Sequence, residues 1–323
     1  MIRNTLNISI SPIKCYLHHA HQLCIVLTDD KKLSWFYSNY AQVYSRDKEI
    51  DLKFDFLSYD GMYPRFPCIN QNWFNREFFL KSQNSLVQFI IDCIDQGFYC
   101  EIVVDEYYIP NKANYMKKSY PHQNLIYGYD KESHNFKIVG FNKHNQFTRM
   151  EIDFERLEEG FAKSPWAGVG FFDVTTSIDY TNADLEINFP LLKIYLSDFV
   201  NSRNSFVHFR PQDAVFGLDT YQLYKKEFLE KEDSDIRPLH TFWEHKRQMV
   251  SRIGFFKETN ALSCPNDLLQ RFIALEQEFL GLRAMMIKYE IVENHMIFDK
   301  ISTKLDILAE EEYKLLNQFI LLL

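Results

Sequence analysis

The chain has 323 residues, of which 46% are hydrophobic and 25% are charged, a composition typical of a folded globular protein with a sizeable core. Its formal net charge is −8, from 36 Lys and Arg against 44 Asp and Glu. A nucleic-acid binder needs a basic surface and a membrane-spanning helix needs about eighteen apolar residues, so composition and pattern argue against both classes.

The cysteines and the first residues indicate a compartment. No CxxC pair and no zinc-finger spacing occurs among the six cysteines, and the first fourteen residues contain no long apolar segment. We therefore expect no secretory signal, free thiols and a cytoplasmic location.

The first half of the chain, to about residue 180, mixes predicted helices and strands. Helices are predicted where apolar residues recur at helical spacing, and strands where β-branched and aromatic residues cluster between turn residues. The predicted helices cover 12–27 and 85–96, with a short one around 156–161. The predicted strands cover 99–108, 124–129, 136–141 and 169–177, and the middle two form the outline of a hairpin.

The second half of the chain changes to long amphipathic helices. They are predicted over 185–201, 220–230, 238–256, 265–293 and 298 to the end. No Pro- or Gly-rich linker separates the halves. The sequence thus predicts an α+β domain over 1–180 and a docked helical subdomain over 181–323, whose long helices leave room for a homodimer interface.

Cys15 is the candidate nucleophile. With Ser11 as the N-cap and Pro12 in the first turn, Cys15 lies where unpaired N–H groups and the helix dipole favour a thiolate, and Lys14 adds positive charge. The alternative is a small buried side chain, which fits the other cysteines better. They are Cys24, Cys93, Cys100 and Cys264, with Cys68 left open in a predicted loop.

A thiolate nucleophile needs a base, and the base needs an orienting partner. His122 precedes the first strand of the predicted hairpin, and the second strand ends at Asn142, which the hairpin brings back near His122. Asparagine can orient a catalytic histidine. Asp105 and Asp130 stay open as alternatives for this third position.

Two further histidine groups resemble metal sites at first sight. His18 and His21 are three residues apart, but no carboxylate completes a site at helical spacing. His240, Glu244 and His245 match neither HExxH nor HxxEH. We therefore expect no metal site.

Two motifs carry a resemblance to a known family. The first is Val104-Asp105 followed by Tyr107-Tyr108 and Pro110, and the second is His122 followed by Gly128-Tyr129-Asp130. With a cysteine near the N-terminus, this resembles the N-terminal domain of the butirosin-biosynthesis acyltransferase family. The segment from Asp235 to Arg252 is similar to the helical C-terminal part of such proteins.

The resemblance implies a papain-like, peptidase C39-like fold and an activity. Members transfer an acyl group from a carrier-protein phosphopantetheine thioester to an amine in thiotemplated pathways of the nonribosomal-peptide type, which make antibiotics among other products. The amide-forming cysteine-protease homologue of closthioamide assembly is the functional analogue that it suggests. The implied partners are an acyl or peptidyl carrier protein and a small amine, with no cofactor of the enzyme's own.

For this reaction Cys15, His122 and Asn142 are the predicted catalytic residues. The aromatic side chains of Tyr107, Tyr108 and Tyr115, together with Trp166, are predicted to line a dry substrate channel, although ordinary core packing explains each of them as well. A thioesterase or peptidase of the same fold is one rival function. A non-catalytic scaffold for a synthetase, in which Cys15 only packs, is the other.

Overall fold

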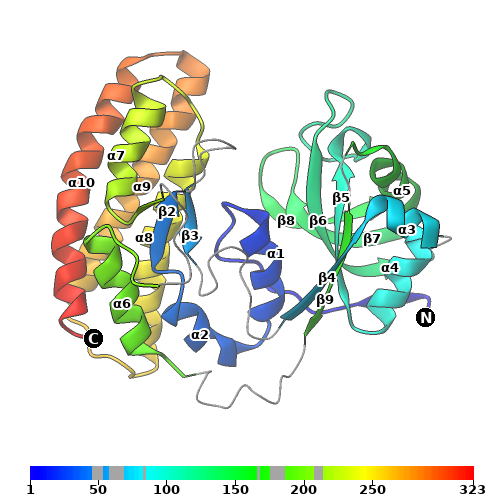
Figure 1. Cartoon of the computed structure of the whole chain (residues 1–323), viewed down its shortest axis with the longest axis horizontal. Coiled ribbons are helices and arrows are strands. Elements are labelled where there is room, and N and C mark those ends of the chain that lie inside the picture. Colours follow the sequence, from blue (N-terminus) through cyan, green and yellow to red (C-terminus); the bar gives the residue numbers. More distant parts are fainter. Residues whose placement is uncertain (46–53, 58–68, 83–84, 166–167, 175–185, 207–213) are drawn as a thin grey trace. The chain divides into compact units, whose positions relative to one another are not determined.

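The computed structural model describes the chain except residues 46–53, 58–68, 83–84, 166–167, 175–185 and 207–213 (Figure 1). The chain forms two compact units. The first consists of Met1–Asp30 and Phe66–Tyr180, and the second of Lys31–Arg65 and Thr181–Leu323. The strands of both units pair antiparallel and helices accompany them, so the fold belongs to the α+β class.

The first unit is built on one antiparallel sheet. Its strands are β1 (Arg3–Thr5), β4 (Ile69–Asn75), β5 (Tyr99–Asp105), β6 (Pro121–Asp130), β7 (Asn135–Phe141), β8 (Phe147–Asp153) and β9 (Gly168–Val174). Its helices are α1 (Leu17–Val26), α3 (Arg76–Ser82), α4 (Leu86–Asp95) and α5 (Phe154–Lys163). The strand order is β4-β9-β5-β6-β7-β8, with β1 paired to β6.

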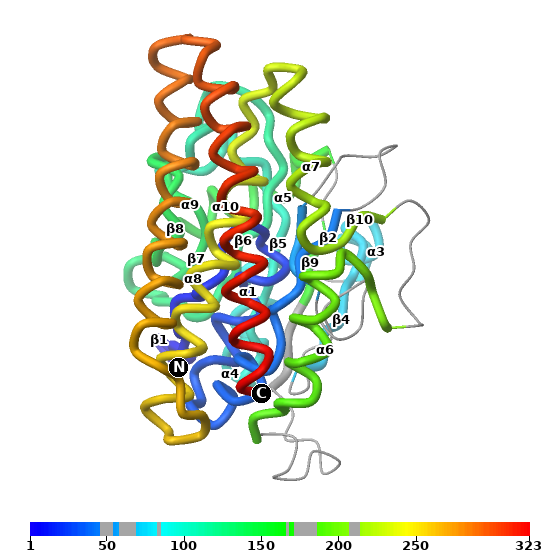
Figure 2. The backbone as a smooth tube through the Cα atoms, turned by 90° about the vertical axis from the view of Figure 1, so that its left-hand side faces the viewer, coloured from blue at the N-terminus to red at the C-terminus, as the bar shows by residue number. Residues whose placement is uncertain are grey.

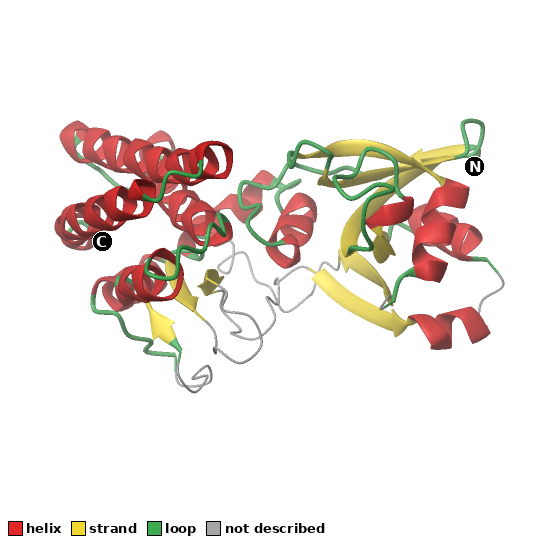
Figure 3. Cartoon of the chain, turned by 90° about the horizontal axis from the view of Figure 1, so that it is seen from above, coloured by secondary structure: helices red, strands yellow, loops and turns green. Residues whose placement is uncertain are grey.

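Helices cover both faces of this sheet (Figure 3). On one face α4 and α5 pack through apolar residues such as Ile90 and Leu157 on Val104 of β5. On the other face α1 packs through Leu17 and its apolar neighbours on Leu125 of β6 and on β7. Because successive side chains of a strand alternate between faces, β5 and β6 are buried on both sides.

The predicted hairpin and the predicted helix over 85–96 are confirmed. Strands β6 and β7 are joined by a short turn, with Asp130 paired to Asn135. Helix α4 begins after Ser85, whose hydroxyl accepts a hydrogen bond from the Gln88 N–H at 3.2 Å. It is followed by Gly97 at φ +89°, a left-handed conformation that glycine adopts without strain.

The predicted start of the first helix is wrong. Helix α1 begins at Leu17 rather than at residue 12, and its N-cap residue Tyr16 makes no side-chain cap. The Ser11 hydroxyl instead closes a local turn, accepting from the Ile13 N–H at 3.2 Å and donating to the Ile13 carbonyl. Serine in this role competes with helix formation. Cys15 therefore lies two residues before the helix and outside its first turn.

The second unit combines a small sheet with long helices. Its strands are β2 (Gln42–Ser45), β3 (Phe54–Leu57) and β10 (Val215–Phe216), in the order β10-β2-β3. Its helices are α2 (Leu33–Ser38), α6 (Phe189–Val200), α7 (Asp219–Tyr224) with a π-helical turn Lys225–Leu229, α8 (Arg237–Glu258), α9 (Asn266–Val292) and α10 (Met296–Ile320). Helix α9 packs beside both α8 and α10 (Figure 2). Among the described residues, none of the helices is apolar over a length that could cross a membrane.

The predicted division into 1–180 and 181–323 is wrong for residues 31–65. These residues belong to the second unit because β2 pairs with β10 and because α8 holds the segment before β2. The buried Arg252 of α8 donates to the carbonyls of Tyr37 and Asn39 at 2.7 and 2.6 Å. The N-terminal unit is therefore interrupted by a segment that folds with the C-terminal helices.

Candidate active site

A histidine–carboxylate pair lies at the rim of the sheet of the first unit. His122 is the second residue of β6, and its Nδ1 is 2.8 Å from Oε1 of Glu106. Glu106 follows β5 directly, in the 3-10 turn Glu106–Tyr108, so the paired strands β5 and β6 bring the two residues together. With Nδ1 donating to the carboxylate, the neutral ring carries its lone pair on Nε2.

The Glu106 carboxylate is buried and is surrounded by hydrogen-bond donors and a positive charge. Its side chain is 4% exposed, whereas that of His122 is 23% exposed and so reaches solvent. Oε2 of Glu106 accepts from the Asn114 amide at 2.9 Å, and Lys112 Nζ lies 4.0 Å from Oε1. Burial raises the pKa of Glu106, but the hydrogen bonds from His122 and Asn114 and the Lys112 charge outweigh it, so the net pKa is lowered.

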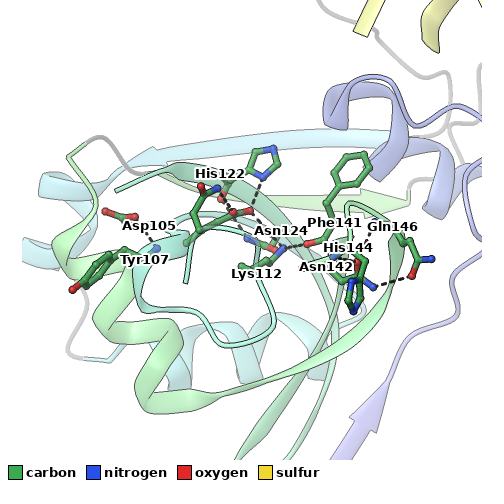
Figure 4. Close-up of polar contacts among 11 residues, drawn as sticks. Asp105, Tyr107, Lys112, His122, Asn124, Phe141, Asn142, His144 and Gln146 are labelled. Atoms are coloured by element: carbon green, nitrogen blue, oxygen red, sulfur yellow. Dashed lines mark hydrogen bonds and ion pairs between the residues drawn. The ribbon is translucent and has the colours of Figure 1, made fainter. Parts of the chain in front are cut away.

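The predicted orienting residue, Asn142, has another role in the structure. Its side-chain carbonyl accepts from the N–H groups of His144 and Gln146 at 2.8 and 3.0 Å, which closes the turn between β7 and β8 (Figure 4). The hairpin brings the end of β7 back beside His122, as expected, but Phe141 rather than Asn142 meets the ring, at 6.4 Å between centroids. Asn142 is thus corrected to a turn residue.

The two alternative orienting residues are also engaged elsewhere. The Asp105 carboxylate accepts from the N–H groups of Tyr107 and Tyr120 at 3.0 and 2.8 Å and from the Ser119 hydroxyl. Burial raises its pKa, and these hydrogen bonds lower it further than burial raises it. Asp130 caps the turn after β6 by accepting from the Glu132 N–H. Asp105 therefore fixes the loop from which Glu106 projects, and Asp130 is a turn residue.

Cys15 and His122 approach the sheet from different elements. Helix α1, which Cys15 precedes, packs on the face formed by Leu125 and its neighbours. His122 is paired with Val104, whose side chain packs on the face covered by α4 and α5. The His122 ring lies at the rim of the sheet, next to the ring of Phe141. Cys15 is half-buried. The pairing of Cys15 with His122 stays a prediction.

Other cysteines are better explained by packing. Cys24, Cys93 and Cys100 are buried in the two cores of the first unit, and Cys264 is buried in the second. Burial raises the pKa of Cys24 to about 12, which makes it a poor nucleophile. Cys68 lies outside the described residues.

The predicted aromatic channel residues lie in the loop after β5. The rings of Tyr107 and Tyr108 meet edge to face at 5.0 Å, and Tyr108 packs on the α4–α5 core beneath Lys163, which lies 4.9 Å from its ring. The Tyr115 N–H donates to the Lys112 carbonyl, so Tyr115 belongs to the same loop. All three are half-buried. Trp166 lies outside the described residues.

His21 and His240 make polar contacts that were not predicted from the sequence. His21 of α1 contacts the buried Glu101 carboxylate of β5 through Nδ1. Nε2 of His240 lies 3.1 Å from the Glu244 carboxylate, and Nδ1 accepts a hydrogen bond from Arg283 at 2.9 Å. The residues that nearly match a zinc motif therefore form an ion-pair network.

Glu106 and Lys112 are the residues of this site that sequence reasoning missed. The signal available was the Asp105-Glu106 dipeptide inside the predicted strand 99–108, of which only Asp105 was considered. Comparison of the sequence with models of known protein families and with curated proteins finds no significant match.

Proposed function

We propose that this chain is a cysteine-dependent acyltransferase of papain-like fold, with Cys15 as nucleophile and His122 as general base. The observation that carries the proposal is the His122–Glu106 pair: a buried carboxylate holds Nδ1 and leaves Nε2 of a solvent-accessible ring as a proton acceptor. Glu106 takes the orienting role first given to Asn142. The donor that we propose is an acyl thioester on a carrier-protein phosphopantetheine, and the acceptor is a small amine.

The proposed reaction has two acyl transfers. In the first, His122 Nε2 takes the Cys15 thiol proton, the thiolate attacks the thioester carbonyl, and the carrier thiol leaves with the proton from His122. In the second, the amine attacks the acyl-cysteine while His122 accepts its proton. The C–S bond then breaks, an amide is formed, and the proton returns to the Cys15 thiolate. Thioester exchange is nearly balanced and aminolysis is downhill, so the chemistry needs no cofactor of the enzyme's own.

The first test measures the reactivity of Cys15 itself. Iodoacetamide labelling is followed by peptide mass spectrometry at pH 6 to 8, for the wild type and for His122→Ala. We expect Cys15 to be alkylated at least ten times faster than glutathione at pH 6.5, and His122→Ala to abolish the excess. A Cys15 no faster than glutathione, or indifferent to His122, would contradict the proposal.

The second test separates the transferase from its rivals. The protein is incubated with octanoyl-pantetheine with and without butylamine, and intact mass and products are recorded. We expect an octanoyl adduct that is lost in Cys15→Ala, retained in Cys264→Ala and discharged to N-butyloctanamide by the amine. Equal loss of thioester without amine points to a hydrolase. The absence of any adduct together with ordinary Cys15 reactivity points to a scaffold.

A further inference from the structure

A lysine is buried behind the histidine–carboxylate pair. Lys112 lies in the loop between β5 and β6, its side chain is 1% exposed, and its Nζ donates to the Phe141 carbonyl at 2.9 Å. The same Nζ stands 4.0 Å from Oε1 of Glu106, the oxygen that His122 contacts. A buried lysine is rare unless it is paired, so its charge requires a local partner, and Glu106 is near enough to be that partner.

The neighbouring strand leaves room for this ammonium group. A Cβ at Gly140 of β7 would lie 3.2 Å from Lys112 Nζ and 3.1 Å from Oδ1 of Asn124. Asn124 is fully buried, and within the described part of the chain its Oδ1 has no hydrogen-bond partner. Gly140 therefore opens a small polar space in which the lysine head group sits between the end of β7 and Glu106.

We propose that Lys112 is a positioning residue of the site: its charge keeps Glu106 as a carboxylate, which in turn holds His122 with its proton on Nδ1 and its lone pair on Nε2. This inference rests on the proposed function. The groups that face Glu106 are His122 from β6 and Lys112 and Asn114 from the loop. An uncharged Glu106 would accept the Nδ1–H hydrogen bond less strongly, so the ring would be held less firmly in this orientation.

The sign of the effect follows from the charges. The Lys112 charge is one of the causes that lower the pKa of Glu106, while burial raises it. When the Lys112 charge is removed, less remains to offset the effect of burial. The pKa of Glu106 therefore rises, and its protonated form persists to higher pH. As the pH is lowered, the variant therefore loses the hydrogen bond that orients His122 at a higher pH than the wild type does.

The variant that isolates the charge is Lys112→Gln, because glutamine retains a hydrogen-bond donor for the Phe141 carbonyl. The ¹³C resonance of the Glu106 carboxyl is followed against pH, and the ¹⁵N shifts of His122 report which ring nitrogen carries the proton. We expect the titration midpoint of Glu106 to move up by about one pH unit and the ¹⁵N shifts of His122 to follow this displaced titration. Lys112→Arg, which keeps the charge, is expected to restore both readouts.

Two controls keep the experiment decisive. Lys117→Met removes an exposed charge from the same loop and is expected to change neither readout. If Lys112→Gln does not fold, Gly140→Ala serves instead: it retains every charge but crowds Lys112 Nζ, and it should move the Glu106 midpoint in the same direction.

An unchanged Glu106 midpoint and an unchanged His122 pattern in Lys112→Gln overturn the inference. So does an effect of Lys112→Gln on the His122 pattern that persists in full in a Glu106→Gln background, because Lys112 is proposed to act through Glu106. Neither readout depends on Cys15. Ordinary reactivity of Cys15 with a shifted Glu106 midpoint would therefore reject the proposed function and leave the role of Lys112 intact.

Discussion

At the scale of single residues, the site depends on which group holds Nδ1 of His122. Glu106 is placed there at 2.8 Å, whereas the Asn142 side chain is committed to its own turn. A buried carboxylate stabilises the imidazolium that forms during catalysis, and a turn asparagine that does not contact the ring cannot do so. The two assignments thus predict opposite results for two simple substitutions.

We expect Glu106→Gln to lower kcat/KM for octanoyl-pantetheine by about 10²- to 10⁴-fold, because the glutamine amide cannot supply the charge and can present a donor to Nδ1. The same variant should slow iodoacetamide labelling of Cys15 and change the ¹⁵N pattern of His122, which a purely structural role would leave unchanged.

The matched variant is Asn142→Ala. Because Asn142 accepts two backbone N–H groups in the turn, its loss should cost about 1 kcal/mol of stability and leave kcat/KM within about twofold. A loss of kcat/KM as large as that of Glu106→Gln would return the orienting role to Asn142.

The sequence allowed part of this site to be predicted. The strand that carries His122 is rich in apolar and aromatic residues and is followed by a clear turn, so the strand could be predicted, although it begins at Pro121 and not at residue 124. Glu106 could not be chosen over Asp105 because the choice depends on which way each side chain leaves the end of β5. That direction is set by the 3-10 turn and by the N–H groups that Asp105 accepts.

At the scale of elements, the sequence predicted those helices and strands whose ends are set by residues close to them in the chain. The Ser85 cap, Gly97 and the β6–β7 turn lie within a few residues of what they determine. The start of α1 was mispredicted because Ser11 closes a turn onto Ile13 instead of capping a helix. Strand β4 was missed because most of its side chains are polar or exposed, and its evidence is the distant pairing with β9.

The packing of α5 on β5 gives a prediction for an element. Gly160 of α5 faces the loop that carries Glu106, and a Cβ there would lie 2.9 Å from Ile109 Cδ1 and 3.2 Å from the Asp105 carbonyl. Alanine favours a helix over glycine, yet we expect Gly160→Ala to destabilise the protein by about 1–3 kcal/mol, because the helix must move away from the sheet. Thermal unfolding measures this, and cysteine labelling should slow because the Glu106 loop shifts.

Gly254 of α8 provides the comparison, because a Cβ at that position would have none of the described residues within 4 Å. Gly254→Ala is expected to stabilise the helix by up to about 1 kcal/mol and to leave Cys15 labelling unchanged. If both substitutions stabilised the protein, the close packing of α5 against the Asp105 loop would be disproved.

At the scale of the whole molecule, the division into units could not be predicted from the sequence. Residues 31–65 are separated from β10 and α8 by more than a hundred positions, and no local pattern records pairing over such distances. What decides their place is a set of buried polar contacts. Arg252 binds carbonyls beside α2, and His245 Nε2 donates to the Ala41 carbonyl at 3.0 Å.

His245 makes the second unit sensitive to acid. Its Nδ1 accepts from the Lys246 ammonium at 2.8 Å while Nε2–H donates to Ala41, so both nitrogens are engaged in the neutral ring. Burial and then the Lys246 charge lower the pKa of His245 to about 4, although contacts with Glu312 oppose the shift. In the unfolded chain the histidine binds its proton at an ordinary pKa of about 6.5.

The direction of the pH dependence follows from this depressed pKa. Between pH 6.5 and pH 4 His245 binds its proton in the unfolded chain but not in the folded one, so its contribution to stability falls as the pH falls and is constant above about pH 7. The loss is roughly 3 kcal/mol by pH 4. The pKa of Glu312 is also lowered on balance, so its contribution is lost in the same direction but only at more acidic pH.

The measurement is urea unfolding between pH 7.5 and pH 4.5, followed by tryptophan fluorescence in a Trp73→Phe, Trp166→Phe background. The remaining tryptophans, Trp35 and Trp243, both belong to the second unit. We expect His245→Asn to be less stable at neutral pH and to show a much flatter pH dependence, whereas His144→Asn, at an exposed turn residue, should retain the wild-type slope. An unchanged slope in His245→Asn would mean that other groups cause the acid sensitivity, and that the buried contact with Ala41 does not require the neutral ring.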